Sequence, residues 1–330
     1  MRSERSLGLA RAERRSRMTL ALSDLPQIIA RHPELSLRQI DVFCDGPRSG
    51  NPAMVVFGGD GLSAAAMQAI ASAVNLSETV FILAPTKGAD YRARIFTARR
   101  EIPFAGHPAL AAVHAFAEET GSDALDLIQA DGLGQTEMVR DRPGGDWRVA
   151  LPAPRFDKPA PRTPSEIAAM LGLPVEALTP EPPHLVATGV RWLLVGLRAD
   201  TALGDVRPDH PAIAEWSRAS KSVGLVPFVR SRRAGVDAEL RSFAPAEGIY
   251  EDPVCGSCAG ALAALLSGGQ AQSFTFLQNG GAKRPGRMRV RLAPPSPPTL
   301  SGRTITAIRG VTCPVLAPSL IIKTKETPHD

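Results

Sequence analysis

Cysteine and long apolar runs are scarce in this sequence, and each shortage argues against a class of protein. Four cysteines in 330 residues are too few, and too irregularly spaced, for the disulfide framework of a secreted domain, which favours the reducing cytoplasm as the location. No apolar stretch approaches the roughly 18 residues that a helical membrane span requires. We therefore expect no membrane-spanning segment and no membrane partner.

The net positive charge is also small outside the first residues. The formal net charge is +5, and residues 1–17 alone hold six arginines and two glutamates, which leaves the rest of the chain near +1. A broad phosphate-binding surface requires clustered positive charge, so we expect no nucleic-acid partner. Residues 1–36 lack the apolar core of a signal peptide and are interpreted as a loose, arginine-rich extension.

Length and composition predict a soluble globular protein with two domains, since 44% of the 330 residues are hydrophobic and 22% are charged. The stretch from Pro152 to Pro164 contains five prolines, which is typical of a junction. We accordingly place the first domain at 37–155 and the second at 156–313, with a last strand that can return to the first domain. Residues 314–330 are interpreted as a tail.

The stretch around Glu78 combines a helix pattern, an acidic residue and a strand pattern. Apolar residues at three- to five-residue spacings predict a helix over 63–74, and a β-branched, apolar run predicts a strand over 79–84. Glu78 then stands at the mouth of a buried strand, where desolvation would raise the pKa of its carboxyl group and suit it to proton transfer. The residues alone also allow a solvated loop glutamate at this position.

A weak internal repeat delivers a glycine and a polar residue to the start of an alanine-rich helix in each half. The two segments are Phe96-Thr97…Glu101…Ala105-Gly106-His107 and Phe243-Ala244…Glu247…Cys255-Gly256-Ser257. Helix N-termini offer free backbone N–H groups and a positive partial charge, so two that face each other would bind a small carboxylate. Chance resemblance between two helix starts is the alternative.

Five motifs, in this order along the chain, resemble those of the PhzF family of phenazine-biosynthesis-like isomerases. They are Ile40-Asp41-Val42-Phe43, Gly50-Asn51-Pro52-Ala53, Asn75-Leu76-Ser77-Glu78-Thr79, Gly106-His107-Pro108 and Glu251-Asp252-Pro253-Val254-Cys255-Gly256-Ser257. The resemblance covers about residues 37–313 and includes Gln278-Asn279-Gly280 and Arg284-Pro285-Gly286. It implies an α/β fold of the diaminopimelate epimerase type, with two pseudo-symmetric domains, each a mixed sheet curled around a central helix, and a cleft between them.

The resemblance also implies a chemistry and the residues that carry it. Glu78 corresponds to the family's catalytic glutamate, His107 to its cleft histidine and Asp252 to its aspartate. The positions that contact the substrate match Ser77, Gly106, Gly256 and Ser257. Such a protein is an isomerase that moves a proton, and with it a double bond, on a small cyclic carboxylate, without metal or organic cofactor. A homodimer is compatible with this arrangement.

Two positions depart from the family pattern and leave other functions open. Ala105 stands where many relatives, and the two-cysteine epimerases and proline racemases, have a cysteine, so a thiol-pair mechanism lacks one member. Cys255 stands where the racemases keep their other catalytic cysteine and where PhzF relatives usually have threonine. It is either a thiolate activated by the helix or a small side chain in place of threonine. The alternatives are therefore an epimerase or racemase that uses Glu78 and Cys255, or a non-catalytic metabolite-binding relative.

Cys255 and Cys258 also have the spacing of a redox pair at a helix start, although no thioredoxin-like βαβ context precedes them. A zinc site would need a second pair of ligands, and Cys44 and Cys313 each stand alone. We therefore expect no metal, and the redox interpretation lacks support from its context.

Overall fold

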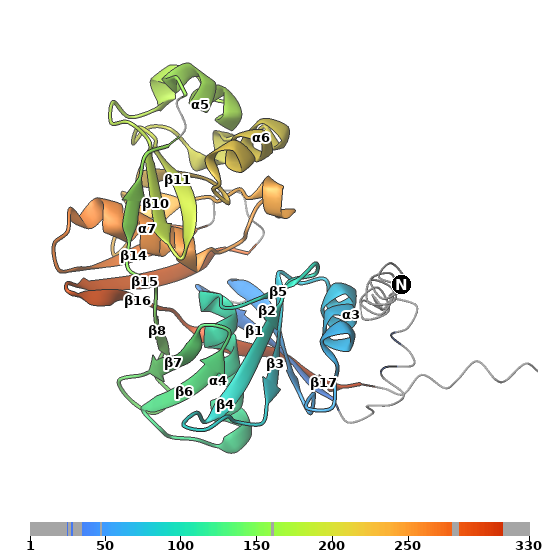
Figure 1. Cartoon of the computed structure of the whole chain (residues 1–330). Coiled ribbons are helices and arrows are strands. Elements are labelled where there is room, and N and C mark those ends of the chain that lie inside the picture. Colours follow the sequence, from blue (N-terminus) through green and yellow to red (C-terminus); the bar gives the residue numbers. More distant parts are fainter. Residues whose placement is uncertain are drawn as a thin grey trace, which may run out of the picture.

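The computed structural model describes residues 25, 28, 35–46, 48–159, 162–278 and 284–312. The predicted tail and nearly all of the predicted N-terminal extension lie outside these residues. Figure 1 shows two lobes, the first built around α4 (Gly106–Thr120) and the second around α7 (Gly256–Ser267). Within the described residues, no helix is long and apolar enough to cross a membrane.

The first half of the chain alternates strands with two helices. Besides α4, its elements are β1 (Ser36–Val42), β2 (Asn51–Phe57), α3 (Ala64–Val74), β3 (Glu78–Leu83), β4 (Tyr91–Phe96), β5 (Glu101–Ile102), β6 (Asp126–Asp131), β7 (Gly134–Val139) and β8 (Arg148–Ala150). The Ser63 side chain caps α3 by accepting a hydrogen bond from Ala66 N, and Asn75 ends the helix in the left-handed conformation. The chain therefore turns directly from α3 into β3.

The second half has its own strands and helices in a similar order. Besides α7, its elements are β9 (Arg155–Asp157), α5 (Pro164–Leu171), η2 (Val175–Ala177), β10 (His184–Thr188), β11 (Val190–Gly196), η3 (Leu203–Asp205), α6 (His210–Ser220), β12 (Gly224–Arg230), β13 (Ala238–Leu240), η4 (Pro245–Glu247), β14 (Gln272–Gln278), β15 (Gly286–Ala293), β16 (Ser296–Ser301) and β17 (Thr304–Val311). The helix predicted at the start of this half is α5, which Thr163 and Glu166 cap reciprocally.

The two halves share one order of strand orientations. In the sheet neighbours β1, β2, β3, β4, β6, β7 and β8, the successive pairings are antiparallel, parallel, antiparallel, parallel, antiparallel and antiparallel. The same series runs through β10, β11, β12, β13, β14, β15 and β16. Helices α3 and α6 take equivalent places in this series, as do α4 and α7. The internal repeat of the sequence is therefore a repeat of whole folding units.

In the described part of the chain, two pairings between strands join the halves. β8 pairs with β16, with Val149 opposite Leu300. β17 crosses back and pairs with β1 over its whole length, from Ser36 opposite Val311 to Val42 opposite Thr304. The last described strand thus belongs to the sheet of the first half, and the second half is inserted between two strands of that sheet.

The central helices are buried on nearly all sides. Nine of the fifteen residues of α4 and nine of the twelve residues of α7 are buried, and half of these buried residues are alanine. A helix that is apolar all round packs inside a core, and small side chains let the curled strands approach it closely. Residues of both helices belong to one continuous hydrophobic cluster. This cluster holds the N-termini of α4 and α7 in fixed positions.

Candidate active site

Glu78 enters the core as the first residue of β3. Its side chain is buried beside β2, where Ala53 is its partner in the parallel register. Burial raises the pKa of Glu78 to about 8, the negative charge of Asp252 adds to this rise, and a hydrogen bond from Ser77 opposes it. Glu78 is therefore a buried carboxyl group that is mostly protonated at neutral pH, and not a solvated loop residue.

His107, the second residue of α4, faces Glu78. Its Nε2 atom lies 3.2 Å from Glu78 Oε2, yet each of these two buried atoms lacks a hydrogen-bond partner among the described residues. Burial lowers the pKa of His107 to about 3, so the ring is neutral at physiological pH and the contact is not an ion pair. The two facing atoms retain hydrogen-bonding capacity for a third group.

Asp252 brings a second carboxyl group from the other half of the chain. It lies in the loop that leads into α7, and its Oδ1 atom accepts hydrogen bonds from Asn51 Nδ2 (2.8 Å) and Val254 N (3.2 Å). Burial raises the pKa of Asp252 to about 6, although these bonds and one from the Cys255 side chain oppose the rise. At neutral pH Asp252 is largely ionised while Glu78 keeps its proton, so the pair presents one acid and one base.

Side chains of the second half hold the start of α7. Gln278 Oε1 accepts a hydrogen bond from Cys255 N (2.9 Å), which satisfies one of the open N–H groups of the helix. Trp192 Nε1 donates to Ser257 Oγ (2.9 Å), and Thr188 Oγ1 donates to Ser257 O (3.0 Å). The polar atoms of Ser257 are therefore fixed by contacts that the sequence pattern did not predict.

The two cysteines of the redox-like spacing are both buried. Cys255 and Cys258 form no disulfide, and Cys255 Sγ lies 3.4 Å from Ser257 Oγ. Burial raises the pKa of Cys258 well above its usual range, so its thiol stays protonated. An exposed thiolate of the kind that disulfide exchange needs is thus missing at Cys258. In the part of the chain that the structure describes, no group of three or more His, Cys, Asp or Glu side chains could hold a metal ion.

Asn51 and Ser77 complete the array of polar groups. Ser77 Oγ donates a hydrogen bond to Asn51 Oδ1 (3.2 Å), and Asn51 Nδ2 reaches across to Asp252. In the sequence, Asn51 stands out only as part of the motif Gly50-Asn51-Pro52-Ala53. Its position could have identified Asn51 as a site residue. Asn51 and Glu78 are polar residues that each begin an apolar strand, and neighbouring parallel strands begin at the same edge of a sheet.

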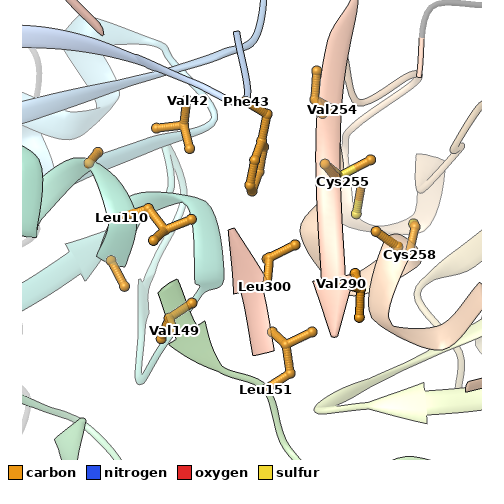
Figure 2. Close-up of a cluster of buried hydrophobic side chains, with 14 of the residues drawn as sticks. Val42, Phe43, Leu110, Val149, Leu151, Val254, Cys255, Cys258, Val290 and Leu300 are labelled. Atoms are coloured by element: carbon orange, nitrogen blue, oxygen red, sulfur yellow. The ribbon is translucent and has the colours of Figure 1, made fainter. Parts of the chain in front are cut away.

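Gly106 and Gly256 are required by the packing between the two helix starts. A methyl group added at Gly256 would come within 2.4 Å of Leu300 Cδ2, and one added at Gly106 would come within 3.1 Å of the same atom. Figure 2 shows Leu300 lying between Leu110 on one side and Cys255 on the other. The two glycines thus allow α4 and α7 to approach one side chain from opposite sides, whatever ligand the site takes.

Gly256→Ala should therefore destabilise the protein, although alanine is the better helix former. Overpacking of this kind costs about 1–3 kcal/mol, which denaturant unfolding can measure. Gly204→Ala is the matched control, because a methyl group added there meets nothing within 4 Å. An equal change in the two variants would show that the contact with Leu300 does not limit this position.

Comparison with known proteins identifies the family to which the chain belongs. A family model described as phenazine biosynthesis-like protein matches residues 40–310. A trans-2,3-dihydro-3-hydroxyanthranilate isomerase from Pseudomonas aeruginosa is 34% identical over 259 residues, which cover 76% of this chain and 88% of that protein. The chain therefore belongs to this phenazine-biosynthesis-like family, and it is an isomerase.

Solved structures confirm the predicted fold. A phenazine biosynthesis protein of the PhzF family from Bacillus anthracis aligns with a TM-score of 0.76 at 23% identity, over 84% of this chain and 98% of that chain. A hydroxyproline epimerase from Agrobacterium vitis aligns with a TM-score of 0.58 at 15% identity, over 84% of this chain and 92% of that one. The fold is thus shared with epimerases whose sequences are distant.

Proposed function

We propose that this isomerase shifts a proton and a double bond on a small carboxylate, with Glu78 as the group that moves the proton. The observation that carries the proposal is the approach of two carboxyl groups, one from each half, namely the buried Glu78 with a pKa of about 8 and the partly buried Asp252 with a pKa of about 6. Such a pair separates the roles of acid and base at neutral pH. We place this reaction in the cytoplasm.

The proton transfer balances within the substrate and Glu78. The protonated carboxyl group of Glu78 donates its proton to one carbon of the substrate's double bond. The carboxylate that results takes a proton from a second carbon, so the double bond moves and Glu78 regains its proton. Asp252 stays ionised and favours the protonated form of Glu78. Neutral His107 offers Nε2 to a polar group of the substrate.

The substrate class follows from the two helix starts. The first N–H groups of α4 and α7 have no partner within their own helix, and a helix N-terminus favours an anion. Gly106, Gly256 and Ser257 lie at these starts, so we propose that a substrate carboxylate binds there while the ring or chain that reacts lies against Glu78. Cys255 transfers no proton in this proposal, because Ala105 at the equivalent position provides no second thiol.

Because the hydrophobic core shared by the lobes is continuous, entry of a substrate requires a local movement where the lobes meet. Two loops meet between them: Arg100 Nη2 lies 3.2 Å from Glu247 Oε2, and the Arg99 guanidinium covers Gly248 so closely that an added methyl group would come within 2.5 Å of it. Arg100 and Glu247 are both exposed, and exposed ion pairs contribute only about 0–1 kcal/mol. A contact this weak lets the two loops part while the shared core stays packed, which supports local closure around a substrate.

Proton exchange in deuterated water tests the proposal. The first probe is trans-2,3-dihydro-3-hydroxyanthranilate, which the name of the Pseudomonas aeruginosa relative gives as its substrate, followed by a panel of small amino and hydroxy acids. We expect at least one probe to gain a carbon-bound deuteron and to be isomerised. Folded protein that binds a probe but exchanges no proton in any of them would favour the metabolite-binding alternative.

The pH profile of kcat/KM should be bell-shaped. The proposed active form has Glu78 protonated and Asp252 ionised, so activity should fall below about pH 6, where Asp252 gains a proton, and above about pH 8, where Glu78 loses one. Initial rates across this range measure both limbs. A profile that continues to rise well above pH 8 would mean that ionised Glu78 starts the reaction.

A further inference from the structure

Asn51 links the two halves of the chain inside the site. It is fully buried and begins β2 directly after Gly50. Its Nδ2 atom donates to Asp252 Oδ1 (2.8 Å) and to the Val254 carbonyl oxygen (2.9 Å), and its Oδ1 atom accepts from Ser77 Oγ (3.2 Å). One amide therefore joins the loop before α7 to the residue that precedes Glu78.

The orientation of this amide is determined by its partners. The carbonyl oxygen of Val254 can only accept a hydrogen bond, so the nitrogen of Asn51 must face it. One N–H group then serves Val254, the other serves Asp252, and the amide oxygen is left for the Ser77 hydroxyl. An ionised aspartate at this position would place an oxygen, which can only accept, against two other acceptors, Asp252 Oδ1 and the Val254 carbonyl oxygen.

The backbone around Asn51 is equally constrained. Gly50 has a φ of 79°, and a methyl group added there would come within 2.3 Å of the Val42 carbonyl oxygen. Gly50 N donates to the Pro285 carbonyl oxygen (2.7 Å), and Arg284 Nε donates to Gly50 O (3.0 Å). A residue held by contacts to both halves is well placed to fix the distance between them.

We propose that Asn51 is a positioning residue that holds Asp252 and Ser77 in place beside Glu78, so that its loss changes how the two carboxyl groups share one proton. The inference rests on the proposed function of Glu78 and Asp252. Asn51 acts through these residues and contacts the substrate at no step.

The neighbours of Asp252 support this role. Three titratable groups interact with the Asp252 side chain, namely Glu78, Cys255 and Cys258. The neighbouring carboxylate of Glu251 is bound by Arg241 through two hydrogen bonds. Apart from the backbone of Val254 and the thiol of Cys255, Asn51 provides the hydrogen bond that lowers the pKa of Asp252. Cationic side chains are absent from this set of described neighbours, so the amide has no charged substitute.

Ser77 carries the effect of Asn51 to Glu78. The Ser77 hydroxyl group can donate one hydrogen bond, and in the structure it donates this bond to Asn51 Oδ1. A hydrogen bond from Ser77 to the Glu78 carboxylate instead lowers the pKa of Glu78. A protonated Glu78 leaves the Ser77 proton to Asn51. The same three groups can therefore adjust when Glu78 gives up its proton and regains it.

Titration of the carboxyl groups tests the inference without any substrate. In protein labelled with ¹³C in its carboxyl groups, the signal of Asp252 is assigned by comparison with Asp252→Asn. In Asn51→Ala the midpoint for Asp252 should move upward by about one pH unit, because a hydrogen bond to the charged form is lost. The acidic limb of the kcat/KM profile should move by the same amount, with KM changing less than kcat.

Gln129→Ala is the matched control. Gln129 is also a fully buried amide, but its partners are Tyr91 and Asp131, outside the site. It should lose a similar amount of stability without a shift in the titration of Asp252. Should Asn51→Ala unfold, the near-isosteric Asn51→Asp replaces it, with the same upward shift expected once residue 51 is ionised.

The outcomes separate the inference from the proposed function. An Asp252 midpoint that is the same in folded Asn51→Ala as in the unaltered protein would overturn the role of Asn51, even if Glu78→Gln is inactive. Full activity in Glu78→Gln would overturn the proposed function, while a shifted Asp252 midpoint would still show that Asn51 sets the state of that carboxyl group.

Discussion

Glu78→Gln should lower kcat by at least about 100-fold while the protein remains folded. Glutamine keeps the shape of the side chain but can neither donate nor accept a proton near neutral pH. The variant should also gain stability relative to the unaltered protein as the pH rises from 4.5 towards 8. Folded Glu78 keeps its proton over this range while the unfolded group loses its own, so ionisation opposes folding. Turnover and thermal unfolding at several pH values measure both effects.

Glu137→Gln is the control for this substitution. Glu137 is an exposed residue of β7, so the same chemical change should leave kcat and stability nearly unaltered. If Glu78→Gln turned over substrate at a rate comparable to the unaltered protein, a single-glutamate mechanism would be wrong, and Cys255 would become the next candidate for the proton-transfer group.

Leu300→Ala should destabilise the protein by about 2–5 kcal/mol, the usual range for a fully buried leucine. The lost methyl groups are those that face Gly106 and Gly256, so the cavity opens between the starts of α4 and α7. These starts carry His107 and follow Asp252, and their separation sets the geometry of the site. We therefore expect kcat to fall as well. Denaturant unfolding and initial rates measure the two changes.

Leu133→Ala is the matched control for Leu300→Ala, because Leu133 is 63% exposed and its loss should change stability by no more than about 0.5 kcal/mol. The contact itself is tested by combining substitutions. Gly256→Ala should cost less in the Leu300→Ala background than in the unaltered protein, since the added methyl group enters the space that is left. Additive losses would show that the two positions do not touch in solution.

The helices and most strands could be predicted because their apolar periodicity is strong, and the glycines of the internal repeat indicated the starts of α4 and α7 correctly. α4 begins at Gly106 and α7 at Gly256, the two glycines that the repeat places at the helix starts. Ala105 and Cys255, at the N-cap positions, make no side-chain capping hydrogen bond to the backbone of the helix. The usual signal of a helix start is thus missing where open N–H groups would serve a ligand.

The sequence did not predict β16. It contains Pro297 and Pro298, which argue against a strand because proline donates no ladder hydrogen bond. The strand forms because Thr299, Leu300 and Ser301 pair with β8 and β15 at once, in the join between the lobes. The bond between Asn51 and Asp252 was likewise beyond sequence reasoning, since it spans 201 residues and exists only after both halves have packed together.

The return of β17 to β1 has a consequence for synthesis on the ribosome. Strands β10 to β16 follow one another along the chain, so the second lobe can complete its sheet as soon as they emerge. β1 is made first, yet one of its edges has no partner until residues 304–311 have been translated. The first lobe therefore completes its sheet last, and for most of translation the nascent chain carries an open strand edge, the feature most prone to pairing with another chain.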